Sequence, residues 1–230
     1  TYNITVDGHA ILAGGNASAG VLGGGNGGDV RLTAGTLSLG RDFLMRSGTS
    51  NLVSGTGGGA FLALNAIAVN GSSPQTFTFI NGGGAFEASF HTLSVNSDLS
   101  FDVQNITGTA GNSLLFRELL LNGEGRVFSI SSNSDFGFDR NLQTSRVNGR
   151  NSEIVSRSAQ TDLVSAAGKS FIFDMPADMA AGETMLTIRQ STAGTALDMS
   201  GVSLAVNGAP GGLRSGDRIY LIKVDNGLFS

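Results

Sequence analysis

The residues that could act in catalysis are few and lie far apart in the chain. The sequence has many serines, but only two histidines, His9 and His91, are present as bases. A hydrolase with a nucleophilic serine places it beside a histidine, often in a G-x-S-x-G turn, and the sequence lacks this turn. His91 occupies a polar position of the repeat described below, so we interpret it as an exposed surface histidine.

Acidic residues offer a second candidate, because Asp98, Glu124 and Arg150 recur at equal intervals that match the repeat described below. A structure with this repeat would stack them on its outer face. Most glycoside hydrolases use two carboxylic acids that flank the scissile bond in a groove. Two acids and an arginine one repeat apart are more typical of a solvated charge ladder. We predict such a ladder, and no catalytic, cofactor-binding or metal-binding residue in the chain.

Glycines cluster near the N-terminus. Residues 23–28 fit the G-x-G-x-x-G pattern of dinucleotide-binding proteins, but that pattern requires a following helix, and residues 29–32 alternate as a strand does. We therefore interpret the segment as a loop. The stretch from Gly24 to Asp29 also fits the first half of a calcium-binding nonapeptide. It occurs once, and Arg31 stands where a large apolar residue belongs, so a single calcium site stays open as the less favoured interpretation.

Strands are the elements that would carry these residues. A short phrase returns at a constant interval of about 26 residues through the middle and C-terminal part of the chain. Its fourth and sixth residues are apolar, as in Ile67 and Val69, whereas its second residue is polar in the central copies. Alternation with period two is typical of a strand with one face in a core. The copies begin at Leu64, Phe90, Phe116, Leu142, Gly168 and Gly194, and earlier copies begin at Thr1 and Ala34.

The residue that ends each phrase forms a column of its own, and one residue of the inward columns is polar. Asn tolerates left-handed backbone conformations at sharp turns, and stacked Asn side chains can hydrogen-bond along a ladder. We predict such a ladder, while Ser145 breaks the apolar pattern of its column. The column contains Asn70, Asn96, Asn122, Asn148, Asp174 and Ser200.

A repeat unit of this length is too small to close a core alone, but copies stacked at the strand spacing of about 4.8 Å can bury a continuous column. We predict an all-β fold: a right-handed, single-stranded parallel β-helix, or β-solenoid, with coils of about 26 residues. Residues 1–201 would form the coils, with a Gly-rich loop near residues 14–28. Residues 202–230 would form a C-terminal cap or folding-core-like segment of the same domain.

Composition narrows the function classes. Charged residues make up 14% of the chain, the net charge is −4, and Lys and Arg are scattered, which argues against a nucleic-acid partner. With 35 glycines but 40% hydrophobic residues, the chain falls outside the disordered and collagen-like classes. It has no cysteine and no apolar stretch close to the about 20 residues of a membrane helix. Residues 1–6 read as a strand, so we expect any targeting signal to lie outside this sequence.

Two C-terminal stretches carry a resemblance to a known family. They are Val202-Ser-Leu-Ala-Val-Asn-Gly208 and Leu213-Arg-Ser-Gly-Asp-Arg-Ile-Tyr-Leu-Ile222. Together they resemble the run with which many passenger domains of bacterial autotransporters, the type V secreted proteins, enter their folding core. The resemblance implies a right-handed β-helical stalk that is secreted or displayed on the bacterial cell surface. It also implies a parent protein with an outer-membrane β-barrel that this chain lacks.

Two functions follow as hypotheses. The first is a noncatalytic structural or adhesive module for adherence, biofilm or aggregation, whose partner would be a host-cell or matrix surface, a polysaccharide or a sister-cell adhesin. The second is a carbohydrate-active β-helix, either a polysaccharide lyase or hydrolase or a tail-spike-like binding protein. A groove with two carboxylates about 5 to 9.5 Å apart would favour the enzyme. A flat, polar rod would favour the adhesive module.

Overall fold

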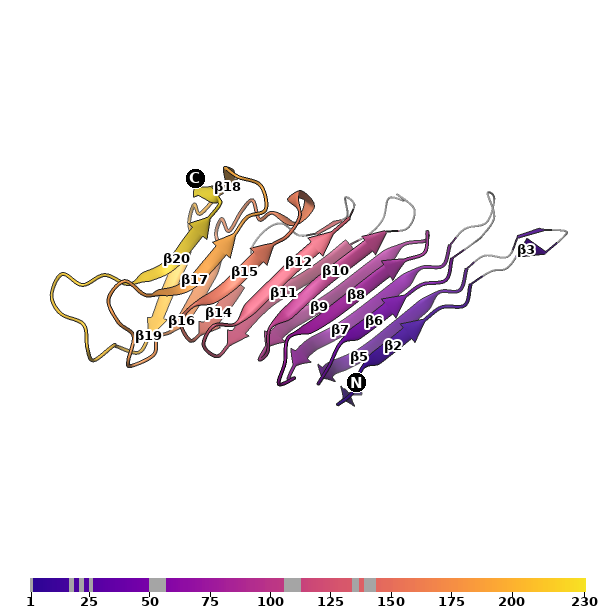
Figure 1. The fold of residues 1–230 in the computed structure, drawn as a ribbon, viewed down its shortest axis with the longest axis horizontal. Helices are drawn as coiled ribbons and strands as arrows, with labels where there is room; N and C mark the ends of the chain where they lie inside the picture. The colour runs from indigo at the N-terminus through magenta and orange to yellow at the C-terminus, as the bar shows by residue number, and fades with distance from the viewer. Residues whose placement is uncertain are drawn as a thin grey trace.

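The chain folds into a stack of parallel strands. The computed structural model describes residues 2–16, 19–20, 23–24, 27–49, 57–105, 113–133, 137–138 and 144–230. Within these ranges the one helix is a single 3-10 turn, η1 (Ala159–Thr161). The strands wind into a β-solenoid of about 7 turns with about 29 residues per turn, and the two ends of the chain lie at opposite ends of the stack (Figure 1). The predicted parallel β-helix is therefore confirmed.

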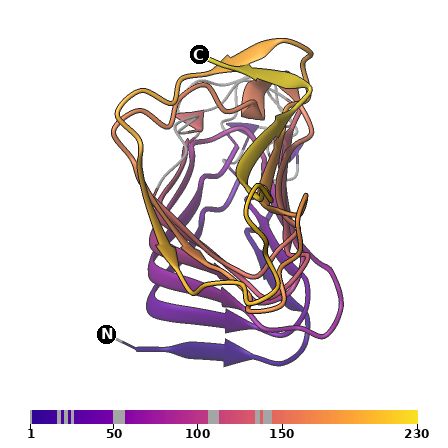
Figure 2. The ribbon, with the colours of Figure 1, turned by 90° about the vertical axis from the view of Figure 1, so that its left-hand side faces the viewer.

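Two sheets form the walls of the stack, and every strand in them pairs in parallel with the equivalent strand of the next turn (Figure 2). Sheet A contains, in order, β1 (Ile4–Val6), β5 (Val30–Leu39), β7 (Ala60–Val69), β9 (Phe86–Val95), β11 (Ser113–Asn122), β14 (Thr144–Asn148), β16 (Ser170–Asp174) and β19 (Ser203–Asn207), and β13 (Gly137–Phe138) also pairs with β11. Sheet B contains β2 (Ala10–Ala13), β6 (Phe43–Arg46), β8 (Gln75–Asn81), β10 (Leu99–Asn105), β12 (Val127–Ser132), β15 (Ser152–Ser156), β17 (Thr184–Arg189) and β20 (Tyr220–Asp225).

Two short pairs complete the described strands. Near the C-terminus β18 (Thr195–Leu197) pairs in parallel with β21 (Gly227–Phe229). Near the N-terminus β3 (Ala19–Gly20) and β4 (Gly23–Gly24) form an antiparallel pair, which projects from the first turn (Figure 1). No helix within the described ranges is long and apolar enough to cross a membrane.

The predicted register holds in the middle of sheet A and fails at its C-terminal end. Ile67 pairs with Leu93, and the following steps reach positions 119, 145 and 171 at the same interval. The partner of Phe171 is then Leu204, where the constant interval predicted Leu197. The predicted copy that begins at Gly194 is therefore wrong, because its Leu197 lies in β18 and pairs with Phe229.

A longer loop explains this shift. Residues 175–183 connect β16 to β17, whereas the much shorter segment 149–151 connects β14 to β15. The extra residues delay the return of the chain to sheet A, so the segment that lies one regular interval after β16 falls on another side of the solenoid. Leu197 still points into the core there, where it is fully buried.

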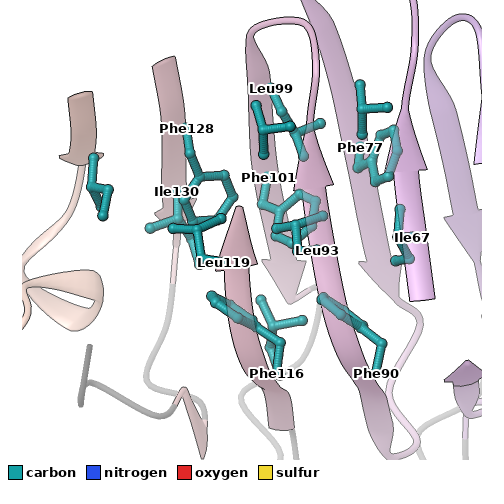
Figure 3. Packing of buried hydrophobic residues seen from close by; sticks show 14 of the residues in the cluster. Ile67, Phe77, Phe90, Leu93, Leu99, Phe101, Phe116, Leu119, Phe128 and Ile130 are labelled. Atoms are coloured by element: carbon teal, nitrogen blue, oxygen red, sulfur yellow. The ribbon is translucent and has the colours of Figure 1, made fainter. Parts of the chain in front are cut away.

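Inward-facing apolar side chains fill the solenoid from turn to turn (Figure 3). Phe101 packs edge-on against Phe128 with ring centroids 5.2 Å apart, and Phe90 stacks on Phe116 at 5.5 Å. Ser145 occupies its inward column as predicted and is 1% exposed. Stacked and edge-to-face rings bury large apolar areas, so the Phe columns are a major part of the core.

Each long strand of sheet A bends at its middle. In β7 the alternation of buried and exposed residues skips one position, so Asn65 and Ala66 both face outward. The same skip occurs at His91 in β9 and at Arg117 in β11. The bend makes two outer walls from one strand and places the polar second residue of these phrases at the corner between them.

A line of backbone contacts closes the first three turns where sheet B leads back to sheet A. The N–H of Gly28 donates to the carbonyl of Gly15 (2.7 Å), Gly48 to Gly28 (2.9 Å), Gly58 to Gly48 (2.8 Å) and Gly84 to Gly58 (3.3 Å). We call these five residues the glycine seam. A Cβ atom on Gly48 would lie 2.0 Å from the Gly15 oxygen, so the close approach requires glycine.

The C-terminal turns are closed differently, by a third wall that consists of residues 157–169 and 190–202. The N–H of Ala166 donates to the carbonyl of Asp198 (2.7 Å), and Leu163 and Leu197 are buried beneath this wall. The segment 202–230 adds the last turn, with β19, β20 and β21, and leaves Leu204 and Phe229 about half exposed. Its predicted role as a folding core stays a prediction.

Candidate functional site

The predicted charge ladder forms in part: Arg150 binds Glu124, whereas Asp98 pairs with Arg126, which was not a predicted member. Arg150 donates through Nε to Glu124 Oε1 at 2.8 Å and also pairs with Asp178 and Glu183. The hydrogen bond to Glu124 is the main reason that the pKa of Arg150 is raised above its ordinary value. Asp98 lies 3.6 Å from Arg126 and accepts a hydrogen bond from the N–H of Val127. These contacts tie successive turns together.

The two histidines lie apart and are about half exposed. His9 Nδ1 is 3.5 Å from Asp42 at the N-terminal end of sheet B. His91 Nδ1 is 3.1 Å from the Thr92 hydroxyl and 3.8 Å from Glu118 on the outside of sheet A. Neither histidine hydrogen-bonds to a serine side chain within the described ranges, so no Ser–His pair forms there. His91 is a surface residue, as predicted.

The possible calcium loop falls partly outside the described residues, since residues 25 and 26 are not among them. Its last residue, Asp29, accepts a hydrogen bond from the N–H of Gly59 in the next turn (2.7 Å) and pairs with Arg31 (3.2 Å). The Gly59 hydrogen bond is the main cause that lowers the pKa of Asp29. Within the described ranges no group of three or more His, Asp or Glu side chains is placed to hold a metal ion.

A shallow groove on the outer wall of sheet A brings together side chains of mixed chemistry from three turns. Arg31 in β5, Phe61 in β7 and Glu87 in β9 are direct neighbours in the sheet register. The Arg31 guanidinium lies over the Phe61 ring, 3.8 Å from its centroid. The groove has a volume of about 200 Å³, and its other walls come from Thr33, Leu62, Ala63 and Ser89. We call it the Arg31 groove.

A second row of side chains lies beside Arg31, Phe61 and Glu87 and also lines the groove. Thr33, Ala63 and Ser89 are neighbours in the same three strands. Because Ala63 is short, it leaves a notch between the side chains of Thr33 and Ser89, both of which carry hydroxyl groups. The groove thus offers one aromatic edge, one cation, one carboxylate and two hydroxyls within a small area.

Two further hollows lie outside the solenoid. One, on the N-terminal part of sheet B, is lined mainly by apolar side chains that include Ile11, Leu44 and Ile80. Ile11 is 67% exposed. The other lies at the corner where Asp98 and Arg126 pair. The sheet B hollow also contains His9, Asp42 and the buried Phe43, but among the described residues only the Arg31 groove has a guanidinium that lies over an aromatic ring.

The predicted Asn ladder forms along part of its length. Asn96 Nδ2 donates to Asn70 Oδ1 (2.7 Å) and Asn122 Nδ2 donates to Asn96 Oδ1 (2.8 Å). Asn148 continues the column by position, but no side-chain hydrogen bond joins it to Asn122 in the described structure. The predicted member Ser200 is wrong, because the register shift places Asn207 next to Asp174.

Comparisons with protein-family models, with curated proteins and with solved structures found no match. The geometry of the site therefore carries the functional inference by itself.

Phe61 is the site residue that sequence reasoning missed. Most of the largest fully buried side chains are phenylalanines, whereas Phe61 faces outward. Phe61 precedes the repeated phrase, and counting back by two from the inward Leu64 assigns Leu62 inward and Phe61 outward. The alternation therefore contained the signal, although it could not reveal that Arg31 stacks on the ring.

Proposed function

We propose that the chain is a noncatalytic structural and adhesive module of a protein that is secreted or displayed on the bacterial cell surface. The observation that carries the proposal is the stack itself, a rod of about 7 turns whose two ends lie far apart (Figure 1). Stacked repeats of this kind present long lateral surfaces for binding. Turn-to-turn ion pairs such as Arg150–Glu124 serve the scaffold.

The partner is proposed as a host-cell or matrix surface, a polysaccharide or a sister-cell adhesin. The bacterial location and the link to an outer-membrane β-barrel rest on the resemblance of residues 202–208 and 213–222 to autotransporter passengers. The open Arg31 groove on a lateral wall is the feature of the rod best suited to contact such a partner.

A carbohydrate-active β-helix is the second candidate, and the same groove favours it. Glu87 faces the groove and makes no ion pair within the described ranges. Hydrolysis of a glycosidic bond usually needs a second carboxylic acid across the sugar. Asp29, the acid beside Arg31, already accepts the Gly59 N–H and pairs with Arg31. We therefore rank adhesion above catalysis.

One experiment tests both. Beads coated with the purified chain would be mixed with epithelial cells, matrix proteins, immobilised polysaccharides and a second set of coated beads. The supernatants would be assayed for new reducing ends and unsaturated sugars. We expect binding to at least one surface without product release. Product release would establish the enzyme instead, and the absence of both binding and product would reject both functions.

A further inference from the structure

We propose that the Arg31 groove binds a neutral polysaccharide chain that runs across the turns of the solenoid. The proposal rests on the adhesive function above and names its ligand class. Side chains from three successive turns line the groove, and these turns repeat at about 4.8 Å. An extended sugar chain presents hydroxyl groups at a similar repeat, so successive sugars would meet equivalent positions on β5, β7 and β9.

The chemistry of the groove suits a sugar with both polar and apolar surface. Small-ligand sites combine apolar or aromatic surface with a few polar groups that fix orientation. The edge of the Phe61 ring and the methyl group of Ala63 provide apolar surface for the C–H groups of a pyranose ring. Glu87 can accept hydrogen bonds from hydroxyl groups, and the guanidinium of Arg31 retains N–H donors beyond its bond to Asp29.

The charges of the groove favour a neutral ligand. Arg31 is paired with Asp29 at 3.2 Å, so its charge is already balanced. Glu87 adds a carboxylate without an ion pair in the described structure. The groove and its rim therefore carry a net negative charge, which repels uronic acids and sulfated sugars. A neutral hexose polymer avoids this repulsion. Its hydroxyl groups can still form the hydrogen bonds with Arg31 and Glu87 that are described above.

The aromatic ring is held in place by its neighbours, so the site is preformed. The Arg31 guanidinium covers the Phe61 ring. A Cβ atom on Gly59 would lie 2.4 Å from Phe61 Cε2, which means that the ring packs closely over the Gly59 backbone. A fixed ring loses little entropy when a ligand binds. Even so, a groove this shallow should bind weakly, with a dissociation constant on the order of 1 mM.

Amide chemical shifts of the full chain report binding directly. The probes are cellohexaose, maltohexaose and laminarihexaose as neutral chains and a hexamer of galacturonic acid as the anionic chain. We expect at least one neutral hexamer to shift amides near residues 31–33, 61–63 and 87–89, and the anionic hexamer to leave them unchanged. Shifts confined to other regions, preferential binding of the anion, or no shift with any neutral probe would overturn the proposal.

Matched variants decide whether the groove is responsible. Arg31→Ala, Glu87→Gln and Phe61→Ala should each raise the dissociation constant at least tenfold, whereas Phe61→Tyr should keep affinity within threefold of the parent chain. Arg117→Ala removes an exposed arginine at the corner of the same sheet and should change nothing. Thermal melts establish that each variant is folded. Unchanged affinity in folded Arg31→Ala and Glu87→Gln would overturn the proposal.

The bead assay separates this inference from the adhesive function. If the groove variants bind cells or matrix as well as the parent chain does but no longer bind the neutral hexamer, the sugar site stands and that adhesion uses another surface. If the parent chain adheres yet binds no neutral sugar, the sugar site is rejected while the adhesive function stands. If the chain adheres to nothing but binds the hexamer in the groove, the adhesive function fails and the sugar site is supported.

Discussion

The N-terminal turns and the C-terminal turns of the solenoid are closed by different contacts. Both must bring the chain from sheet B back to sheet A. The first three turns do so through the glycine seam, in which the backbones of successive turns touch directly. The last turns use the third wall, where a buried side chain adds to backbone hydrogen bonds such as the one from Ala166 to Asp198. Asp162 accepts the N–H groups of Ser191 (2.6 Å) and Thr192 (3.0 Å).

The glycine seam and the third wall should therefore respond differently to substitution and to pH. Backbone contact at the glycine seam leaves no room for a side chain at Gly48, Gly58 or Gly84 but uses no charge. These positions should therefore tolerate changes of pH and fail on substitution. The third wall depends on a buried carboxylate and on neighbouring ion pairs such as Arg189–Glu153. It should therefore respond to pH. A stack thus places different demands on sequence at its two ends although its core is continuous.

The largest loss of stability is expected for a substitution in the core that the N-terminal and C-terminal turns share. Leu119→Asp would bury an unpaired carboxylate among Leu93 and Ser145, at a cost of several kcal/mol. Both regions should then lose cooperative unfolding. Arg117→Asp, close to it in the same strand but exposed, should alter thermal stability by about 0.5 kcal/mol or less. Equal melting temperatures for the two variants would contradict the inward and outward assignment.

The second-largest loss of stability is expected for a substitution in the glycine seam. Gly48→Ala would place a methyl group against the Gly15 oxygen and 2.5 Å from the Gly28 nitrogen, so the backbone of two turns must move. We expect a loss of about 3 kcal/mol, measured by chemical denaturation. The control is Gly15→Ala, whose added Cβ would meet nothing within 4 Å. If both variants unfold at the same denaturant concentration, direct backbone contact does not close these turns.

The sequence predicted the core of this structure better than its corners. Alternation and the constant spacing of the repeat were enough to align Ile67, Leu93 and Leu119, because a buried column demands apolar residues at a fixed phase. The same pattern predicted a wrong partner strand for Leu197. An apolar alternating segment pairs with whichever neighbour the preceding loop length allows, and residues 175–183 change that length without altering the alternation.

The candidate site was predictable only in part. Charge-ladder members such as Glu124 and Arg150 could be paired from their spacing, since a parallel stack brings equivalent positions together. Arg31, Phe61 and Glu87 also occupy equivalent positions, but the sequence interval from Arg31 to Phe61 is longer than the interval from Phe61 to Glu87. Their stacking depends on side-chain rotamers and on the close packing of Phe61 over Gly59, which no sequence period specifies.

A third prediction concerns the pH dependence of the C-terminal wall. Burial raises the pKa of Asp162, but hydrogen bonds from the Ser191 backbone and from nearby Ser and Thr residues outweigh burial, so its pKa lies below the ordinary value. A carboxylate with a lowered pKa stabilises the fold above the unfolded-state pKa of about 3.9, and this stabilisation is lost as the pH falls through the folded-state pKa. Below about pH 4, amides of residues 190–195 should therefore lose protection before those at Gly48 and Gly58.

The control for that prediction is Asp162→Asn, which keeps one acceptor oxygen and cannot titrate. It should lose about 1 to 3 kcal/mol at neutral pH because one of the two N–H groups loses its carboxylate acceptor. Its remaining stability should vary less between pH 7 and acid than that of the parent chain. Equal acid sensitivity of the two proteins would show that Asp162 does not control the C-terminal wall.

The smallest effect is expected in the Asn ladder, which lies on the surface between the two regions. Asn122 donates to Asn96, and Asn96 in turn donates to Asn70, so replacing Asn122 with Ala leaves the Asn96 carbonyl without its partner. Water can reach this partly exposed site, and the cost should be about 1 kcal/mol, at the lower end of the range for a lost hydrogen bond.

Asn148→Ala is the matched control, because Asn148 holds the same position one turn later without a side-chain bond to Asn122, and it should cost only a few tenths of a kcal/mol. Denaturation midpoints measured side by side decide the matter. If the two alanine variants lose the same stability, the amides contribute through their turn conformation and the ladder adds nothing of its own.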